Sequence, residues 1–365
     1  AKNWDEFREA CLYFNIPGEN MVWADKYGDI GWQAVGIAPI RTTHSGLVPV
    51  SGDGNFEWNG YLPIIQKPNL FNPESGYIST ANQNVTPDDY KYWNAIGYDW
   101  ADPYRGDRIN KFLNEKDRFN IQEMINLQVD YFSIPAEQIL NLSKGLIKNN
   151  LEYYAKLNEW DRKLTKNSIE AGIYIEWQNQ LFFEINKRYV PDNVQKYISM
   201  QLFRIIEKLS NMGIEDRSDI LNKTFDLSIE NLKNKFGDNY QKWQYGQEEY
   251  KRVKIYHPLE KVVNDSIKNI IALETFPRGG DGYTPGSTSN DLNQSSGGSF
   301  RVMIDTGDWD NSLATNSPGQ SGNPESKFYK NLYEDWANDI YFPLLYSKNK
   351  ILMNLSHREV FKPSN

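Results

Sequence analysis

The chain has 365 residues, of which 39% are hydrophobic and 14% aromatic, so it can bury a substantial core and does not resemble a disordered segment. Its formal net charge of −8 argues against nucleic acid as the main partner, because no excess of basic side chains is present to neutralise phosphates. The single cysteine, Cys11, excludes an intramolecular disulfide and a cysteine-based zinc site, and three histidines far apart in the sequence (His44, His257 and His357) argue against a multi-histidine metal centre.

No stretch of the sequence approaches the roughly 18 apolar residues that cross a bilayer, so no membrane span is expected. The first residues, AKNWDEF, lack the basic and apolar regions of a signal peptide. With so few histidines and one cysteine, any catalysis must rely on hydroxyl, amide, carboxylate or backbone groups.

The N-terminal part of the chain is predicted to begin with a helix and a hairpin. Asn3 and Glu6 have the spacing of a capping box, which predicts a helix over residues 3–14. NMVWAD and IGWQAVGIAPI flank turn residues at 26–29 and predict two antiparallel strands. Residues 41–76 are rich in turn signals and are expected to form loops.

The segment GYISTANQN, residues 76–84, ends in a cluster of uncharged amides. Tyr77 and Ile78 are good β formers, so a strand is predicted over 76–82 with Asn82 at its end. The amides that follow could simply form a turn, because Asn tolerates a left-handed backbone and caps helices. They could also serve a reaction, because an amide NH2 is an uncharged donor that binds an oxyanion without titrating. Residue type alone favours the turn.

The rest of the chain is predicted to form two regions after a first region at 1–107. Residues 108–278 should be mainly helical, and Asn120 and Glu123 repeat the capping-box spacing. Residues 279–365 begin with the loop-like GGDGYTPGSTSNDLNQSSGGS. A strand in SFRVMIDTGDW, a helix in FYKNLYEDWANDIYF and a terminal strand in KILMNLSHREVF should follow. Strands near both ends of the chain predict that the two ends share one sheet.

Motifs spread over the whole chain point to a family. They are VWADKYGDIGW, GLVPVSGDGNFEWNGYLP, FNPESGYISTANQN, LQVDYFS, WDRKLTKNSIEAGIYIEW, GGDGYT and DTGDWDNSLATNSPGQSGNP. Together and in this order they resemble the penicillin amidase family of N-terminal-nucleophile hydrolases, which includes penicillin, cephalosporin and acyl-homoserine-lactone acylases. The resemblance implies an α+β fold: part of an αββα sandwich with antiparallel sheets and a large helical insertion.

The resemblance also implies a mechanism for hydrolysing the side-chain amide of a penicillin, a cephalosporin or an acyl-homoserine lactone. In this family a Ser exposed by autocatalytic cleavage attacks the amide, and its own α-amine is the base. A backbone N–H and an Asn side chain hold the oxyanion, and by position that Asn matches Asn82. A family Arg some two dozen residues later matches Arg108, with a few extra residues between them.

The implied role of Arg108 is to orient Asn82 and the amine of the nucleophile; the alternative is a surface charge at the start of a helix. Asn84 is expected only to support its neighbour Asn82. No cofactor is needed for this chemistry. A structural calcium ion is compatible with the resemblance, but it has no assignable ligands in this sequence.

In family members, the text resembling AKNWDEF lies well inside the heavy chain, downstream of the N-terminal Ser, and Ala1 offers no nucleophilic atom. The sequence is therefore expected to be the C-terminal part of a heavy chain, inactive alone. Its expected partners are a small-molecule amide and the upstream part of the same precursor, namely the light chain and the heavy-chain segment that carries Ser. The resemblance also implies a periplasmic or secreted protein.

Two functions of other classes remain open from the sequence. Exposed Trp and Tyr side chains in loops suit stacking on sugars, as in a carbohydrate-binding module. A non-catalytic interaction domain is the second alternative. The order of the family motifs favours the amide hydrolase over both.

Overall fold

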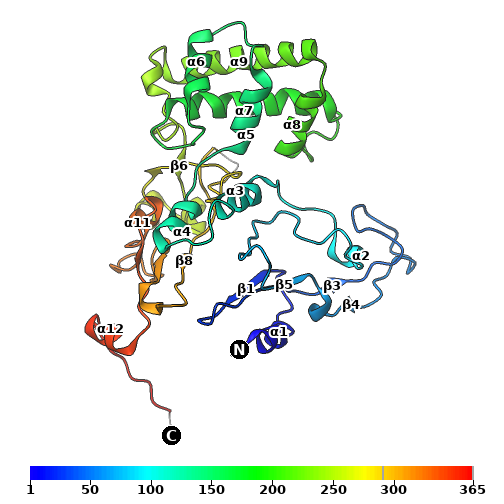
Figure 1. The fold of residues 1–365 in the computed structure, drawn as a ribbon. Coiled ribbons are helices and arrows are strands. Elements are labelled where there is room, and N and C mark those ends of the chain that lie inside the picture. Colours follow the sequence, from blue (N-terminus) through cyan, green and yellow to red (C-terminus); the bar gives the residue numbers. More distant parts are fainter. Residues whose placement is uncertain (290–291, 364–365) are drawn as a thin grey trace. The chain divides into compact units, whose positions relative to one another are not determined.

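The structure is a computed structural model that describes residues 1–289 and 292–363 (Figure 1). It divides into two compact units, Ala1–Arg118 and Phe119–Asn365. The three regions predicted from the sequence (1–107, 108–278 and 279–365) were distinguished by their secondary structure and composition. The two units are defined by contacts, so the three-region division stays a prediction. In the described part of the chain, no helix combines the length and the apolar character that crossing a membrane requires.

The first unit is built on a three-stranded antiparallel sheet with a helix against it. Helix α1 starts as predicted, because the side chain of Asn3 accepts a hydrogen bond of 2.9 Å from the backbone N–H of Glu6. The predicted hairpin is also confirmed, and its second strand pairs with a third, in the order β1-β2-β5. The elements of this unit are α1 (Trp4–Cys11), β1 (Asn20–Ala24), β2 (Ile30–Ala34), β3 (Ala38–Pro39), β4 (Tyr61–Leu62), η1 (Ile64–Gln66), β5 (Asn69–Phe71), α2 (Trp93–Ile96) and α3 (Tyr104–Leu113).

An aromatic cluster joins α1 to this sheet. The ring of Trp4 stacks on Phe71 of β5, with 5.4 Å between ring centroids, and on Phe7 at 5.7 Å. It also lies over Gly31 of β2, where an added Cβ would come within 2.2 Å of the indole. A side chain at position 31 would therefore prevent α1 from packing on the sheet.

The strand predicted over 76–82 is wrong. These residues all lie in the described part of the chain, and they form turns and irregular structure between β5 and α2. The backbone is left-handed at Gly76 (φ 71°) and at Asn82 (φ 66°), which is incompatible with a strand at either end. The polar side chains of the segment bind helix α3 instead of lining a sheet.

The second unit contains a helical layer centred on α7, which Figure 1 shows together with α5, α6, α8 and α9. The indole N–H of Trp177 in α7 donates to Thr224 Oγ1 of α9 (3.1 Å), and its ring meets Phe225 at 4.9 Å. The capping box predicted at the start of α4 is confirmed. The helices are α4 (Ile121–Gln128), α5 (Ile134–Ser143), α6 (Leu151–Glu159), α7 (Ile169–Tyr189), α8 (Leu202–Asn211) and α9 (Ile214–Phe236).

The remainder of the second unit forms short helices and two small antiparallel sheets, ordered β10-β9-β8 and β6-β7. The strands near the two ends of the chain therefore lie in separate sheets, and the prediction of one shared sheet is wrong for the described residues, because β8 pairs with the nearby β9. The elements are η2 (Tyr240–Lys242), β6 (Arg252–Val253), η3 (Pro258–Lys261), α10 (Asp265–Ile271), β7 (Phe276–Pro277), β8 (Arg301–Met303), η4 (Trp309–Asn311), β9 (Leu313–Thr315), α11 (Tyr333–Ala337), β10 (Phe342–Pro343) and α12 (Lys348–Met353).

The last predicted strand, in KILMNLSHREVF, is also wrong, because this segment begins with helix α12. Ser347 caps that helix by accepting from the backbone N–H of Lys350. The helix predicted in FYKNLYEDWANDIYF is confirmed only at α11, over five residues.

The Gly/Ser-rich loop is a packed part of the second unit. Residues 279–289 and 292–299 form no helix or strand, as predicted, and positions 290 and 291 lie outside the described residues. Lys251 is fully buried (0% exposed), and its ammonium donates a hydrogen bond of 2.6 Å to the carbonyl of Thr288 in this loop. Burial raises the pKa of Asp281 in this loop to about 6.

A buried ionic cluster lies beside that loop. The guanidinium groups of Arg278 and Arg301 both donate to Asp339 Oδ1, at 2.8 and 2.5 Å. The hydroxyl of Tyr131 donates to the other carboxylate oxygen at 2.6 Å. One carboxylate thus ties together four segments that are distant in sequence, and it sits on a left-handed residue, with φ 61° at Asp339.

Candidate active site

Asn82 lies in the turn that follows β5, on the way to α2 and α3. Its backbone is left-handed, a conformation that Asn adopts more readily than most residues other than Gly. Its carbonyl accepts a hydrogen bond of 3.0 Å from the backbone N–H of Ala101. The residue is exposed. The backbone of this Asn is therefore held by another part of the first unit.

The side chain of Asn82 is oriented by Arg105, the second residue of α3. Arg105 Nη2 donates a hydrogen bond of 2.7 Å to Asn82 Oδ1. Because a guanidinium has donors and no acceptor, the atom that faces it must be the amide oxygen, and the NH2 group must point the other way. Among the described residues, that NH2 group has no hydrogen-bond partner. The result is an exposed, uncharged double donor with a fixed direction.

Burial lowers the pKa of the Arg105 guanidinium from its usual value. An arginine remains protonated at any physiological pH despite such a shift. The positive charge next to Asn82 is therefore permanent, and it strengthens the hydrogen bond to the amide oxygen.

Gln83, the residue after Asn82, packs against the same turn of α3 that contains Arg105. Gln83 Oε1 accepts a hydrogen bond of 2.6 Å from the backbone N–H of Ala81, so its side chain folds back past Asn82. It also lies against Gly106, where an added Cβ would come within 2.5 Å of Gln83 Cδ.

Two further side-chain pairs extend this contact along α3. The hydroxyl of Ser79 donates to Asn110 Oδ1 at 2.6 Å, and that of Tyr77 donates to Asn114 Oδ1 at 3.2 Å. Positions 106, 110 and 114 are four residues apart and share one face of the helix. Residues 77–83 therefore run antiparallel to α3 and are held by side chains rather than by a β ladder.

Comparison with known proteins identifies the family of the chain. A sequence model described as penicillin amidase matches residues 1–352. The chain belongs to the penicillin amidase family.

Relatives in this family carry acylase names. The acyl-homoserine lactone acylase QuiP of Pseudomonas aeruginosa is 25% identical over 93% of this chain and 46% of its own length. The penicillin acylase 2 proenzyme of Pseudomonas sp. (strain SE83) is 26% identical over 94% of this chain and 46% of its own length. The penicillin G acylase of Escherichia coli is 34% identical over 34% of this chain and 14% of its own. The chain thus spans about half the length of the first two relatives.

The fold is also that of a penicillin acylase. The thermostable penicillin G acylase from Alcaligenes faecalis superposes with a TM-score of 0.67 at 18% sequence identity, covering 100% of this chain and 71% of that chain. The predicted α+β class, as part of an N-terminal-nucleophile hydrolase fold, is confirmed.

The two site residues predicted from the penicillin amidase resemblance lie in the same unit. Arg108 is on α3, one turn after Arg105, and is half-buried. The arginine that is seen to bind the Asn82 side chain is Arg105, which the sequence reasoning missed. The signal was present, because Arg105 follows Asn82 by 23 residues and needs no extra residues in between. The roles of Asn82 and Arg108 stay predictions.

Asn84 holds its own turn. Its Oδ1 accepts a hydrogen bond of 3.0 Å from the backbone N–H of Thr86, and the residue is exposed. This is the bond of an Asx turn, in which the side chain replaces a backbone acceptor. The expectation that Asn84 only supports Asn82 stays a prediction.

The penicillin amidase resemblance is compatible with a structural calcium ion, for which the sequence offers no assignable ligands. Within residues 1–289 and 292–363, no group of three or more His, Cys, Asp or Glu side chains could hold a metal ion. Calcium also takes backbone and amide carbonyl oxygens as ligands, and the structural calcium ion stays a prediction.

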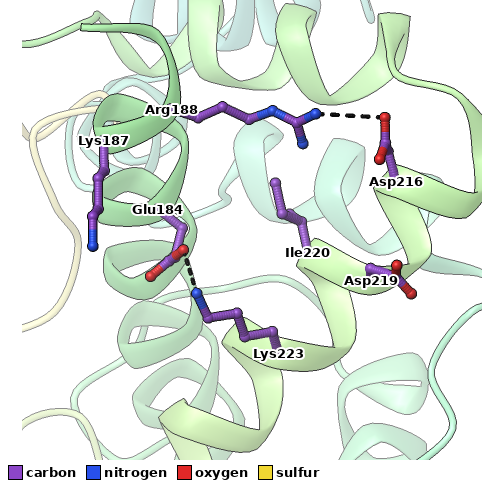
Figure 2. A pocket seen from close by; sticks show the side chains of 7 residues that line it. All are labelled: Glu184, Lys187, Arg188, Asp216, Asp219, Ile220 and Lys223. Carbon is purple, nitrogen blue, oxygen red and sulfur yellow. Dashed lines mark hydrogen bonds and ion pairs between the residues drawn. The ribbon is translucent and has the colours of Figure 1, made fainter. Parts of the chain in front are cut away.

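A charged cavity of about 410 Å³ lies between α7 and α9 in the second unit (Figure 2). Ion pairs cross it from Arg188 to Asp216 (3.5 Å) and from Lys223 to Glu184 (2.6 Å). The acidic and basic side chains that line it are equal in number, so it favours neither an anion nor a cation. Its lining residues are Glu184, Lys187, Arg188, Asp216, Asp219, Ile220 and Lys223.

Proposed function

We propose that this chain provides the oxyanion-binding amide of an acylase. An N-terminal Ser upstream attacks the substrate and forms an acyl-enzyme, and Asn82 binds the oxyanion of the tetrahedral intermediates that precede and follow it. The bond that is cleaved is a side-chain amide of the penicillin, cephalosporin or acyl-homoserine lactone type. Family membership supports the reaction class, and the acylase names of relatives that match 93% and 94% of this chain support the substrate class.

The observation on which the proposal depends is the hydrogen bond from Arg105 to Asn82 Oδ1, because it leaves the NH2 group of the amide as an exposed donor. A donor stabilises an oxyanion best when its direction is fixed before the reaction, so that no reorganisation is needed as charge develops. Asn82 has this property on two counts, since its side chain is bound by Arg105 and its backbone by Ala101.

The steps balance without any proton from Asn82. The α-amine of the N-terminal Ser takes the hydroxyl proton as the oxygen attacks the amide carbon, and the carbonyl electron pair moves to oxygen. An Asn82 N–H would donate to that oxyanion. When the electron pair returns, the C–N bond breaks and the leaving amine takes the proton from the α-amine. Water then attacks the ester in the same way and releases the acid.

Arg108 is proposed to act on the same site by orienting Asn82 and the amine of the nucleophile. It belongs to the same helix as Arg105, which allows both guanidinium groups to contribute positive charge near the developing oxyanion. Arg105 has the more direct support, since its bond to Asn82 is seen.

We also propose that the chain acts only together with the upstream part of the same precursor, which would supply the Ser and the backbone donor. The support is that matches to the full-length relatives cover 46% of their length. The chain alone would then hydrolyse no amide, and the acyl-group preference would depend mainly on the upstream part.

The experiment compares the chain alone with the chain co-expressed with its upstream segment. Both are assayed with p-nitroanilides of phenylacetic, octanoic and glutaric acids, which represent three acyl classes. We expect burst release of nitroaniline only from the complete enzyme, and its loss in the Asn82→Ala variant. Burst release by the chain alone, or full activity of Asn82→Ala in the complete enzyme, would contradict the proposal.

A further inference from the structure

Gln83 closes a small turn around Asn82. Its side-chain oxygen accepts from the backbone N–H of Ala81 at 2.6 Å, so a hydrogen bond links the residues on either side of Asn82. Ala81 is buried, with 8% of its surface exposed, and water is a poor substitute for this acceptor. The left-handed backbone of Asn82 lies inside the turn that this bond closes.

Gly106 is the residue that receives Gln83 on α3. It is buried, and an added Cβ would lie 2.5 Å from Cδ and 2.6 Å from Nε2 of Gln83. Glycine inside a helix is less favourable than alanine by about 1 kcal/mol, and here its backbone does not need a left-handed conformation. Close approach of the Gln83 side chain is therefore the reason for glycine at this position.

Consecutive residues of α3 thus hold consecutive residues of the amide cluster. Arg105 binds the Asn82 side chain, and Gly106 gives Gln83 the space it needs to bind the backbone before Asn82. The first contact sets the direction of the amide, and the second sets the backbone from which it projects. An amide directed by Arg105 alone could still shift with its backbone.

We propose that Gln83, seated on Gly106, is a positioning residue that holds Asn82 in the left-handed conformation needed for oxyanion binding. This inference rests on the proposed function of Asn82. It adds that the reaction depends on a glutamine that contacts neither substrate nor nucleophile. Displacing Asn82 by about 1 Å would be enough to lower the rate by about 100-fold.

The test uses the complete processed enzyme and the p-nitroanilide on which it is most active. Gln83→Met keeps the length of the side chain but removes the strong acceptor, whereas Gln83→Glu keeps an acceptor for the Ala81 N–H. We expect Gln83→Met to lower kcat by about 10- to 100-fold with little change in KM, and Gln83→Glu to restore most of the rate. Gln66→Met, at an exposed glutamine on η1, is the matched control and should leave kcat unchanged.

A double-mutant cycle tests the role of Gly106 separately. Gly106→Ala should lower kcat because its methyl group displaces Gln83. In a Gln83→Ala background, the same change should have no further effect, since the side chain that it displaces is gone. Thermal melts of every variant separate a loss of positioning from a loss of fold, and the cycle remains informative if Gln83→Met folds poorly.

Asn82→Ala, measured in parallel, separates failure of this inference from failure of the proposed function. If Asn82→Ala loses activity while Gln83→Met stays within about threefold of the parent, Gln83 positions nothing and the inference is wrong. A rise in KM with unchanged kcat would also overturn it, because Gln83 would then bind substrate. If Asn82→Ala keeps full activity, the proposed function itself fails.

Discussion

Arg105 and Asn82 are joined by a hydrogen bond of 2.7 Å between guanidinium and amide oxygen, although they lie 23 residues apart. A guanidinium can only donate, so this bond determines which end of the amide faces solvent. An exposed asparagine whose NH2 group is directed in this way differs from an ordinary turn asparagine, such as Asn84, whose oxygen accepts from a nearby backbone N–H.

The first prediction concerns the two arginines of α3. In the complete enzyme, Arg105→Ala should lower kcat by about 10- to 100-fold, because Asn82 loses the partner that directs it. Arg105→Lys should recover only part of the rate, since an ammonium lacks the planar arrangement of donors. Arg108→Ala is the matched variant, and steady-state kinetics should show a smaller effect. A larger loss for Arg108→Ala than for Arg105→Ala would return the orienting role to Arg108.

The second prediction concerns the buried carboxylate of Asp339. Asp339→Asn keeps the side-chain shape and tolerates the left-handed backbone, but it removes the negative charge between Arg278 and Arg301. Leaving a buried charge without its partner typically costs about 3–5 kcal/mol of stability. Urea unfolding at neutral pH should therefore show a free energy of unfolding that is lower for this variant by about this amount. A change below about 0.5 kcal/mol, as for an ordinary surface substitution, would contradict the structure of the cluster.

The same cluster predicts a pH dependence. Burial raises the pKa of Asp339, but the charges of Arg278 and Arg301 and the hydrogen bonds from Arg301 and Tyr131 outweigh it and hold the pKa below its usual 3.8. A carboxyl whose pKa is lowered by folding stabilises the protein above its unfolded pKa, and this contribution disappears as the pH falls through the folded pKa. The difference in stability between the parent and Asp339→Asn should thus be constant near neutral pH and shrink below about pH 4. If this difference in stability instead grows as the pH falls, folding does not lower the pKa of Asp339.

The fourth prediction concerns Gly172 in the buried helix α7. An added Cβ would lie 2.0 Å from the backbone oxygen of Trp243, which cannot move aside like a flexible side chain. Gly172→Ala should therefore destabilise the protein by about 1–3 kcal/mol despite the better helix propensity of alanine. Gly52→Ala, in an exposed loop with no atom within 4 Å of the new Cβ, is the control and should be nearly neutral. Equal melting temperatures for Gly172→Ala and the parent would contradict the packing of α7.

Local sequence signals predicted the elements whose stabilising partners are close in sequence. The capping pairs at Asn3 and Asn120 start helices, and the turn after β1 forms the hairpin, because each depends on residues only a few positions apart. The terminal strand predicted in KILMNLSHREVF is wrong, because Ser347 provides a helix cap that favours α12. This cap is a local signal that the sequence analysis missed.

The candidate site shows where sequence reasoning ends. Asn82 was predicted from its place in a family motif, but its left-handed backbone and its bond to Arg105 depend on how residues 77–83 pack along α3. Tyr77 and Ile78 favour a strand by propensity, and tertiary contacts with the helix override it. Sequence spacing could not show which arginine binds Asn82, since Arg105 and Arg108 both follow it by about the expected interval. Their positions on α3 were needed to distinguish them.

The most direct test of the account is acyl-enzyme formation by the complete processed enzyme, measured by pre-steady-state release of nitroaniline. Removing one oxyanion donor typically lowers the rate by about 100- to 1,000-fold. We therefore expect Asn82→Ala to lower the acylation rate by this factor with little change in substrate affinity or melting temperature. Asn82→Asp should be no better, because a carboxylate repels the oxyanion. Asn84→Ala should have a much smaller effect. If Asn84→Ala lowers the acylation rate by about 100-fold or more while Asn82→Ala acylates at nearly the parent rate, the oxyanion role has been assigned to the wrong amide.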